Sequence, residues 1–212
     1  MSNILDLARE LVRKLEEREV VEAVSCDECV ENTGLVELST LSAGDTFKIG
    51  EHDFIVLEQC EDQTKVISKN FMLEDVKFDE DFRDYNSSNL KNRIESDILP
   101  IIEKECGEDF IIEHEVDLTS VDMQNEFEPC KCKVRPITFD EARKYNDLLV
   151  NDDLDGYWWT CTPWSTEERG YRYSIAVVSP SGDFGDCGCS YDWGVRPFCI
   201  LKSNIFVSKG EN

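Results

Sequence analysis

Residues 156–164 read GYWWTCTPW and open the stretch of sequence that decides the fold. The mostly apolar run YSIAVVS at 173–179 follows, and a Pro-Ser-Gly turn at 180–182 ends it, which predicts a β-strand. Two further strands are predicted by VRPFCILKS at 195–203 and by IFVS at 205–208. The end of the chain is therefore expected to be β-rich.

The segment DFGDCGCSYD at 183–192 interrupts these strands and has neither helical nor strand periodicity, which predicts a long irregular loop. It places aromatic, acidic and hydroxyl side chains between glycines. This composition is typical of a recognition loop, because rigid rings supply contact area and hydroxyl groups supply adaptable hydrogen bonds. Trp158 or Trp159, by contrast, is expected to fill the core beneath the C-terminal strands.

Upstream, short β-rich runs predict a hairpin or a meander. They are TFKI at 46–49, HDFIVLE at 52–58 and TKVIS at 64–68, with a Gly-Glu turn at 50–51. Strands followed by helices and then by further strands form an α+β plan with antiparallel sheets.

Two helices are predicted between the β regions. Residues 87–105 have helical periodicity, with Ser87 or Ser88 as the N-cap and a kink or break at Pro100. The predicted buried face consists of Leu90, Ile94, Ile98 and Ile101. Residues 138–149 form the second helix, since Thr138 and Glu141 have the spacing of a capping box. Its predicted buried face consists of Ala142, Tyr145 and Leu149.

Before the β-rich part, residues 1–24 are interpreted as an amphipathic helix and residues 25–38 as a linker, so that one domain spans 39–212. The stripe of this helix consists of Ile4, Ala8, Leu11 and Leu15. Either the helix packs on its own domain, or it associates with a second copy and forms a homo-oligomer.

The charge of the chain excludes several partners. The 212 residues carry 22 Lys and Arg against 46 Asp and Glu, a net charge of −24. Phosphate backbones repel such a protein, so nucleic acid and anionic membranes are not expected partners. No apolar run is long enough to span a membrane, and the first residues lack the apolar core of a signal peptide. The expected location is cytoplasmic or virion-associated, with the ten cysteines as thiols.

The charge is also unevenly distributed. Residues 1–73 carry 16 acidic and 7 basic side chains, and residues 74–128 carry 18 and 5. Residues 129–212 carry 12 and 10, and they contain all four Trp and five of the six Tyr. The nearly neutral, aromatic-rich end of the chain is therefore the expected place for recognition by contact.

No catalytic site is predicted. His52 and His114 are the only histidines, and no motif of a known hydrolase, zinc protease or nucleotide-binding protein occurs. Cys26 and Cys29 form a CxxC pair, and Cys130/Cys132 and Cys187/Cys189 form CxC pairs. A zinc site from Cys26, Cys29, Cys130 and Cys132 is conceivable by ligand count, but buried thiols are the preferred interpretation. No metal, no cofactor and no enzymatic activity are expected.

The residues quoted above also carry a resemblance. A W-W-T-x-T-P segment, a strand ending in S-P-S-G, an irregular loop and then Gly194-Val195-Arg196-Pro197 resemble a bacterial and phage family of C-type-lectin-like domains. That family is related to the formylglycine-generating enzymes and includes the variable proteins of diversity-generating retroelements. The resemblance covers about residues 39–208. It implies a C-type-lectin-like fold with two helices, a long C-terminal loop region and termini joined by antiparallel strands.

The resemblance further implies a hypervariable surface at about residues 170–193 that binds a protein or a cell-surface ligand, in a phage- or prophage-encoded protein. The catalytic cysteines of formylglycine-generating enzymes find no match, so their oxidase activity is not implied. The expected ligand-binding residues are Trp164, Arg172, Tyr173, Phe184, Asp186, Cys187, Cys189, Ser190, Tyr191 and Asp192. Trp193 is expected to belong to the framework, and Arg196 to pair with a carboxylate of the body.

Two alternatives remain open. One is an acidic mimic of DNA that binds a basic protein through residues 74–128. The other is a thiol or metal enzyme of the formylglycine-generating type that uses the cysteine pairs.

Overall fold

The computed structural model describes residues 34–210. The chain divides into two compact units, Met1–Val36 and Glu37–Asn212. The predicted N-terminal helix at 1–24 and most of the linker at 25–38 lie outside the described residues. The last residues of that linker form strand β1 (Leu35–Glu37) and begin the short 3-10 helix η1 (Leu38–Thr40).

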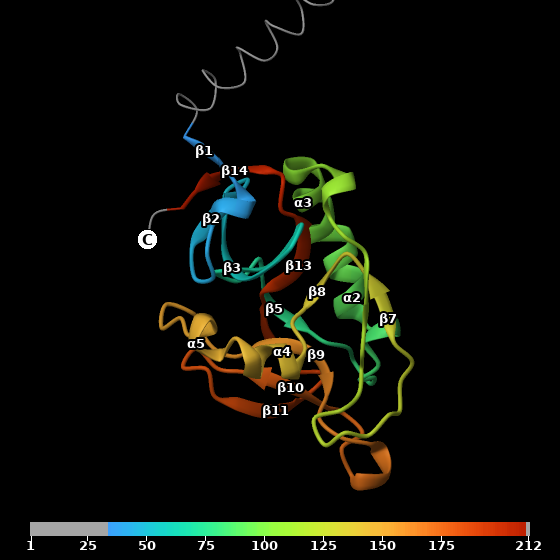
Figure 1. The fold of residues 1–212 in the computed structure, drawn as a ribbon. Helices are drawn as coiled ribbons and strands as arrows, with labels where there is room; N and C mark the ends of the chain where they lie inside the picture. The colour runs from blue at the N-terminus through green and yellow to red at the C-terminus, as the bar shows by residue number, and fades with distance from the viewer. Residues whose placement is uncertain (1–33, 211–212) are drawn as a thin grey trace, which may run out of the picture. The chain divides into compact units, whose positions relative to one another are not determined.

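The larger sheet, within the second unit, has the strand order β14-β2-β3-β4-β13-β8. Its strands are β2 (Thr46–Ile49), β3 (His52–Cys60), β4 (Gln63–Ser68), β8 (Val134–Pro136), β13 (Pro197–Lys202) and β14 (Phe206–Lys209). The predicted hairpin is confirmed, since Ile49 pairs with His52 and Gly50 in the turn has a φ of 60°. β14 pairs antiparallel with β2, so the last strand in the sequence lies beside one of the earliest (Figure 1).

The second sheet has five strands in the order β11-β10-β9-β12-β5. They are β5 (Leu73–Lys77), β9 (Trp158–Pro163), β10 (Ser174–Val178), β11 (Phe184–Gly188) and β12 (Asp192–Val195). β12 runs parallel to β9, and the other pairs are antiparallel. A third, two-stranded sheet joins β6 (His114–Val116) to β7 (Cys130–Cys132). The chain is thus α+β with mostly antiparallel sheets, as predicted.

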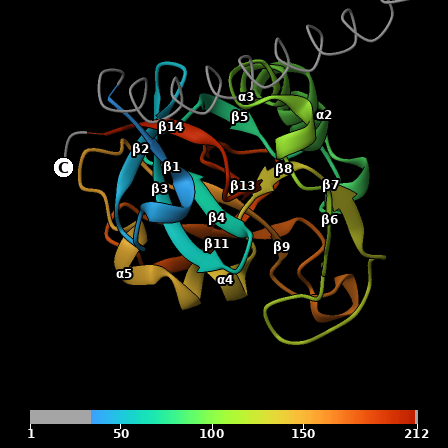
Figure 2. The ribbon, with the colours of Figure 1, turned by 45° about the horizontal axis from the view of Figure 1, so that its top comes forward.

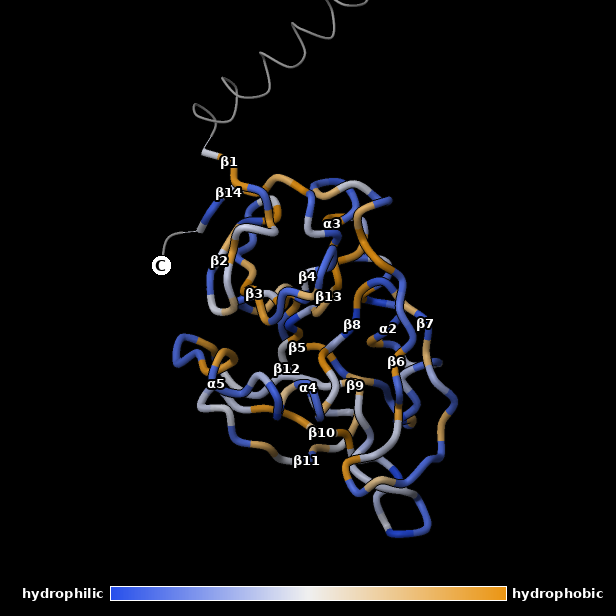
Figure 3. The backbone as a smooth tube through the Cα atoms, in the orientation of Figure 1, coloured by the Kyte–Doolittle hydropathy of each residue, from blue (hydrophilic) through white to orange (hydrophobic). Residues whose placement is uncertain are grey.

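The prediction of an irregular loop at 183–192 needs correction. Residues Phe184–Gly188 form β11, which pairs with the apolar strand β10, drawn largely in orange in Figure 3. The strand was not visible in the sequence because its glycines and Asp186 break the alternation of apolar side chains, while the backbone hydrogen bonds to β10 require no particular side chain. Only the short turn between Gly188 and Asp192 is irregular.

The first predicted helix is confirmed with a change in its buried face. It consists of α2 (Asn89–Arg93), a π-helical turn η3 (Ile94–Ile98) and α3 (Leu99–Cys106), and it runs beside β8 (Figure 2). The Ser88 hydroxyl caps it by accepting a hydrogen bond from the Lys91 N–H. In the π turn, the Leu99 N–H bonds to the carbonyl of Ile94, which adds one residue to the turn just before Pro100. Ile102 is therefore buried, and Ile101 faces solvent.

The second predicted helix is two short ones, α4 (Phe139–Lys144) and α5 (Asn146–Leu149), and the capping box of Thr138 and Glu141 is present. The predicted buried face is confirmed. The remaining short turns are η2 (Tyr85–Ser87), η4 (Glu108–Phe110) and η5 (Glu167–Arg169).

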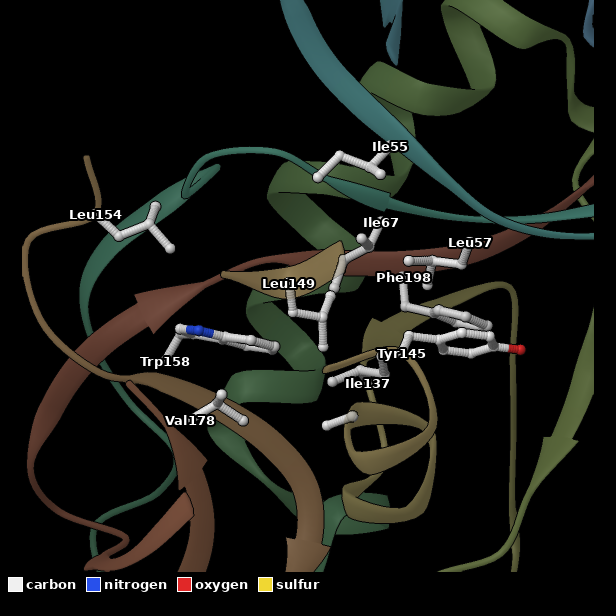
Figure 4. Close-up of a cluster of buried hydrophobic side chains, with 11 residues drawn as sticks. Ile55, Leu57, Ile67, Ile137, Tyr145, Leu149, Leu154, Trp158, Val178 and Phe198 are labelled. Carbon is white, nitrogen blue, oxygen red and sulfur yellow. The ribbon is translucent and has the colours of Figure 1, made fainter. Parts of the chain in front are cut away.

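The main core lies between the two larger sheets. Figure 4 shows Trp158 and Val178 of the five-stranded sheet on one side of Leu149, and Ile67 and Phe198 of the larger sheet on the other. Trp158 has no exposed surface, and neither has Trp159, which points to the opposite face of its sheet and lies 5.7 Å from the ring of Phe78. Both tryptophans therefore fill the interior.

Arg196 enters this core, and the prediction that it pairs with a carboxylate is wrong. Its guanidinium donates to the carbonyl of Ser68 at 3.0 Å and to that of Leu149 at 2.8 Å, and it lies 4.9 Å from the centre of the Trp158 ring. Burial, with no acidic partner among residues 34–210, lowers the pKa of Arg196 to about 9.

Candidate functional site

The hairpin of β10 and β11 brings two parts of the predicted binding segment to the same end of the five-stranded sheet. Ser174 pairs with Gly188, so the residues before β10 lie beside the residues after β11. The Cys189 N–H donates to the carbonyl of Tyr173 at 2.7 Å. Tyr173 is 45% exposed at this end.

The turn after β11 presents Tyr191. Its N–H donates to the carbonyl of Gly188 at 3.1 Å, which closes the turn. A Cβ on Gly188 would lie 3.4 Å from the Tyr191 ring, so the ring rests on the backbone there. Tyr191 is 60% exposed, and the neighbouring Ser190 and Asp192 are exposed as well. A ring that is exposed but supported by backbone offers contact area at a small cost in side-chain entropy.

Cys189 fixes the turn to the neighbouring segment of the chain through its backbone. It is buried, its carbonyl accepts a hydrogen bond from the Asp79 N–H at 3.0 Å, and burial raises the pKa of its thiol to about 11. Asp79 in turn accepts hydrogen bonds from the N–H groups of Asp81 and Phe82, which holds the 79–82 turn beside it. Phe82 in this turn is 63% exposed.

The segment before β10 is held by Asp122. This carboxylate accepts hydrogen bonds from the hydroxyls of Ser120 and Ser165 at 2.6 Å each, and it pairs with Arg169. These contacts, the Ser120 hydroxyl first, lower the pKa of Asp122 to about 2. The following Arg172 lies 3.3 Å from a carboxylate oxygen of Glu167.

We name Arg172, Tyr173, Ser190, Tyr191 and Asp192 the tyrosine surface. All five are exposed, and the hydrogen bond between Cys189 and Tyr173 joins the two segments that carry them. The guanidinium of Arg172 lies 5.3 Å from the centre of the Tyr173 ring. The arrangement combines rings, a hydroxyl and charged groups on loops held by a sheet, a combination that is typical of recognition surfaces.

The other five predicted residues lie elsewhere or have other contacts. Phe184 and Trp164 pack against Phe139 of α4, with ring centres 5.0 and 6.5 Å away, and Phe184 adjoins the main core. Asp186 is exposed in the middle of β11, Cys187 is half-buried and Cys189 is buried. The exposed Phe82 belongs to the 79–82 turn, which the hydrogen bond between Asp79 and Cys189 holds beside the tyrosine surface, and it was not predicted as a binding residue. The sequence offers only a single phenylalanine between charged residues there.

The cysteine pair of β7 gives no metal centre among residues 34–210. In that range, no group of three or more His, Cys, Asp or Glu side chains is placed to hold a metal ion. The Cys132 thiol donates to Cys130, which lowers the pKa of Cys130 and raises that of Cys132. Cys26 and Cys29 lie outside the described residues, so the structure does not test the four-cysteine site, which the sequence made conceivable but did not favour.

His114 belongs to a structural network. Its Nε2 accepts a hydrogen bond from Arg135 at 3.0 Å, and its Nδ1 lies 3.1 Å from the carbonyl of Ile112, an arrangement that requires a neutral imidazole with its proton on Nδ1. Burial and the Arg135 charge lower the pKa of His114. Arg135 also forms two bonds of 2.7 Å with Glu141, beside a polar cavity of about 230 Å³. Because its hydrogen bonds engage His114, Pro136 and Glu141, Arg135 joins β8 to α4.

Comparisons of the chain with protein-family models, with curated proteins and with solved structures each gave no match. Within the described part of the chain, no helix has the length and apolar character needed to cross a bilayer.

Proposed function

We propose that the protein binds a protein or cell-surface ligand through the tyrosine surface, on a C-type-lectin-like scaffold. The observation that carries this proposal is the hydrogen bond of 2.7 Å between Cys189 and Tyr173, which places the exposed rings of Tyr173 and Tyr191 on adjoining segments. Burial of the two rings would supply contact area, while Ser190 and the charged groups would supply specificity.

The scaffold part of the proposal is supported by the pairing of β14 with β2, since the resembling family joins its termini by antiparallel strands. The position of the surface within residues 170–193 is the one that the resemblance implies. A phage or prophage origin, and oligomerisation through residues 1–24, belong to the same proposal; several copies would add avidity. A near-identical template repeat of the 170–195 coding region beside a reverse transcriptase gene is the genomic observation that tests the diversification.

The binding experiment compares the wild type with the double variant Tyr173→Ala, Tyr191→Ala. Each intact chain is immobilised and exposed to an extract of bacterial surface proteins and to a glycan array. The variant Phe206→Ala is the matched control, since Phe206 is also an exposed aromatic residue (54%) but lies on β14 of the other sheet. We expect the double variant to lose the ligands that the control retains, with unchanged melting temperatures. Retention of the same ligands by the double variant would refute the proposal.

A further inference from the structure

A row of hollows follows the edge strand β5 and its neighbour β12, next to the tyrosine surface. The middle hollow has a volume of about 340 Å³ and is lined by the rings of Phe71 and Trp193 and by four carboxylates. We name these residues the acidic furrow; its carboxylates are those of Glu74, Asp75, Asp155 and Asp192. A hollow of about 560 Å³ adjoins it at Asp75 and Asp192, and one of about 360 Å³ adjoins it at Glu74 and Asp155.

The four carboxylates are exposed, and none of them forms an ion pair or a side-chain hydrogen bond with the residues that the structure describes. The neighbouring cations are already engaged. Lys77 pairs with Glu80 at 3.0 Å, and Arg93 pairs with Asp97 at 2.6 Å. Lys69 lies only in the adjoining hollow of about 360 Å³. The four carboxylates of the acidic furrow therefore have no ion-pair partner among residues 34–210, and the nearest positive charge is that of Lys77, which lies opposite Asp192 in the pairing of β12 with β5 and is shared with Glu80.

Two glycines lie against its aromatic walls, one where a ring needs the space of a missing Cβ and one where the backbone has a positive φ. A Cβ on Gly194 would lie 2.5 Å from the Phe71 ring, so only glycine permits that ring to lie against β12. Gly156 has a φ of 101°, and a Cβ there would lie 3.5 Å from the Trp193 ring. Tyr157 contacts Trp193 edge-on, with ring centres 5.2 Å apart. Aromatic rings beside unpaired carboxylates are the surroundings in which ammonium and guanidinium groups bind, through ion pairs and cation–π contacts.

From this charge and ring pattern, and resting on the proposed function, we infer that the ligand is a basic protein whose lysine or arginine side chains enter the acidic furrow. Asp192 belongs to both regions and directly follows Tyr191, so a partner that covers the two tyrosines reaches the furrow without a gap. Three adjoining hollows suit several side chains of one polypeptide better than one small cation. A partner with phosphate groups is repelled by the same carboxylates.

The test uses an octa-arginine peptide and the intact chain in about 0.15 M salt, where charges more than about 8 Å apart are largely screened. The furrow variant is Asp155→Asn, Asp192→Asn, and a second, independent one is Glu74→Gln, Asp75→Asn. The matched control is Asp109→Asn, Glu113→Gln, which removes the same charge from two exposed carboxylates that do not line these hollows. We expect titration calorimetry to show Kd about tenfold higher for each furrow variant and at most about twofold higher for the control.

Equal weakening by the control would refute the inference, because the peptide would then respond only to net charge. Spermine that binds the wild type as tightly as the peptide does, and loses affinity equally in the furrow variants, would also refute it in favour of a small polyamine. The double variant Tyr173→Ala, Tyr191→Ala is tested for ligand capture separately. Capture that survives this variant contradicts the proposed function, whereas peptide binding that survives the furrow variants contradicts only the inference.

Discussion

Replacing Phe184 with alanine is expected to destabilise the domain, whereas replacing Tyr191 with alanine is not. Both lie in the ten-residue segment whose sequence predicts a binding loop. The Phe184 ring, however, packs on the main core, with its centre 5.0 Å from that of Phe139. The Tyr191 ring is 60% exposed and touches Gly188. The two variants therefore separate a packing role from a contact role within one segment.

The magnitudes follow from burial. Removing a fully buried phenylalanine side chain costs about 3–5 kcal/mol, and half of that, about 2 kcal/mol, is expected for the half-buried Phe184. Removing the exposed Tyr191 ring is expected to change the free energy of unfolding by no more than about 0.5 kcal/mol. At about 2–4 °C per kcal/mol for a domain of this size, Phe184→Ala lowers Tm by about 4–8 °C, and Tyr191→Ala by about 2 °C at most.

Urea unfolding followed by circular dichroism, together with thermal melting, measures both effects, and Phe206→Ala gives the reference for an exposed ring. The same preparations are tested for ligand capture. Capture should depend on Tyr191 more strongly than Tm does. An equal loss of stability in the Phe184 and Tyr191 variants would refute the division between core and surface that the burial of these rings implies.

Three further outcomes are expected. Glu141→Gln removes the charge that pairs with buried Arg135 and should lower the free energy of unfolding by about 3 kcal/mol, measured by urea titration. An unchanged urea midpoint would show that the fold does not depend on this ion pair. Because the pKa of His114 is lowered in the folded protein, the unfolded chain binds a proton more strongly, so the free energy of unfolding is greatest above the ordinary pKa of about 6.5 and falls below it. The urea midpoint should therefore decrease between pH 7.5 and pH 5.5, and the decrease should be smaller in His114→Gln. Gly194→Ala forces a Cβ to within 2.5 Å of the Phe71 ring and should cost about 1–3 kcal/mol, measured by thermal melting; no loss would show that the ring moves freely.

Much of the fold could be predicted because its elements have local signals. The hairpin of β2 and β3, the cap at Ser88 and the capping box at Thr138 are each encoded within a few residues of the site where they form. The change from Ile101 to Ile102 could not be predicted, since periodicity assumes a uniform helix and the π turn at Ile94–Ile98 adds a residue. Strand β11 was missed because its pairing depends on β10 and not on its own side chains.

The candidate site was predicted only in part, for a related reason. Composition marked the segment that ends at Asp192, but composition does not distinguish Tyr191 at a turn from Phe184 at the beginning of a strand. That distinction depends on α4, whose Phe139 covers Phe184 from a distant part of the sequence. The acidic furrow was not predicted as a site, although its Glu74 and Asp75 lie in the acidic segment 74–128, because Phe71, Asp155 and Asp192 come together only through the pairing of β12 with β5 and with β9.

The nearly neutral net charge of residues 129–212 does not describe the surface that these residues form in the folded chain. Its 12 acidic and 10 basic side chains suggest a nearly neutral surface. Arg196, however, is buried against carbonyls, and three further basic residues pair with acids from earlier in the chain: Lys133 with Glu103, Lys144 with Glu58 and Arg169 with Asp122. Four of the ten therefore do not offset the acids of their own segment, and Asp155, Asp186 and Asp192 stay without an ion pair among the described residues. We therefore expect added salt to weaken the binding of the basic partner that we infer, because salt screens the attraction between its cations and these carboxylates.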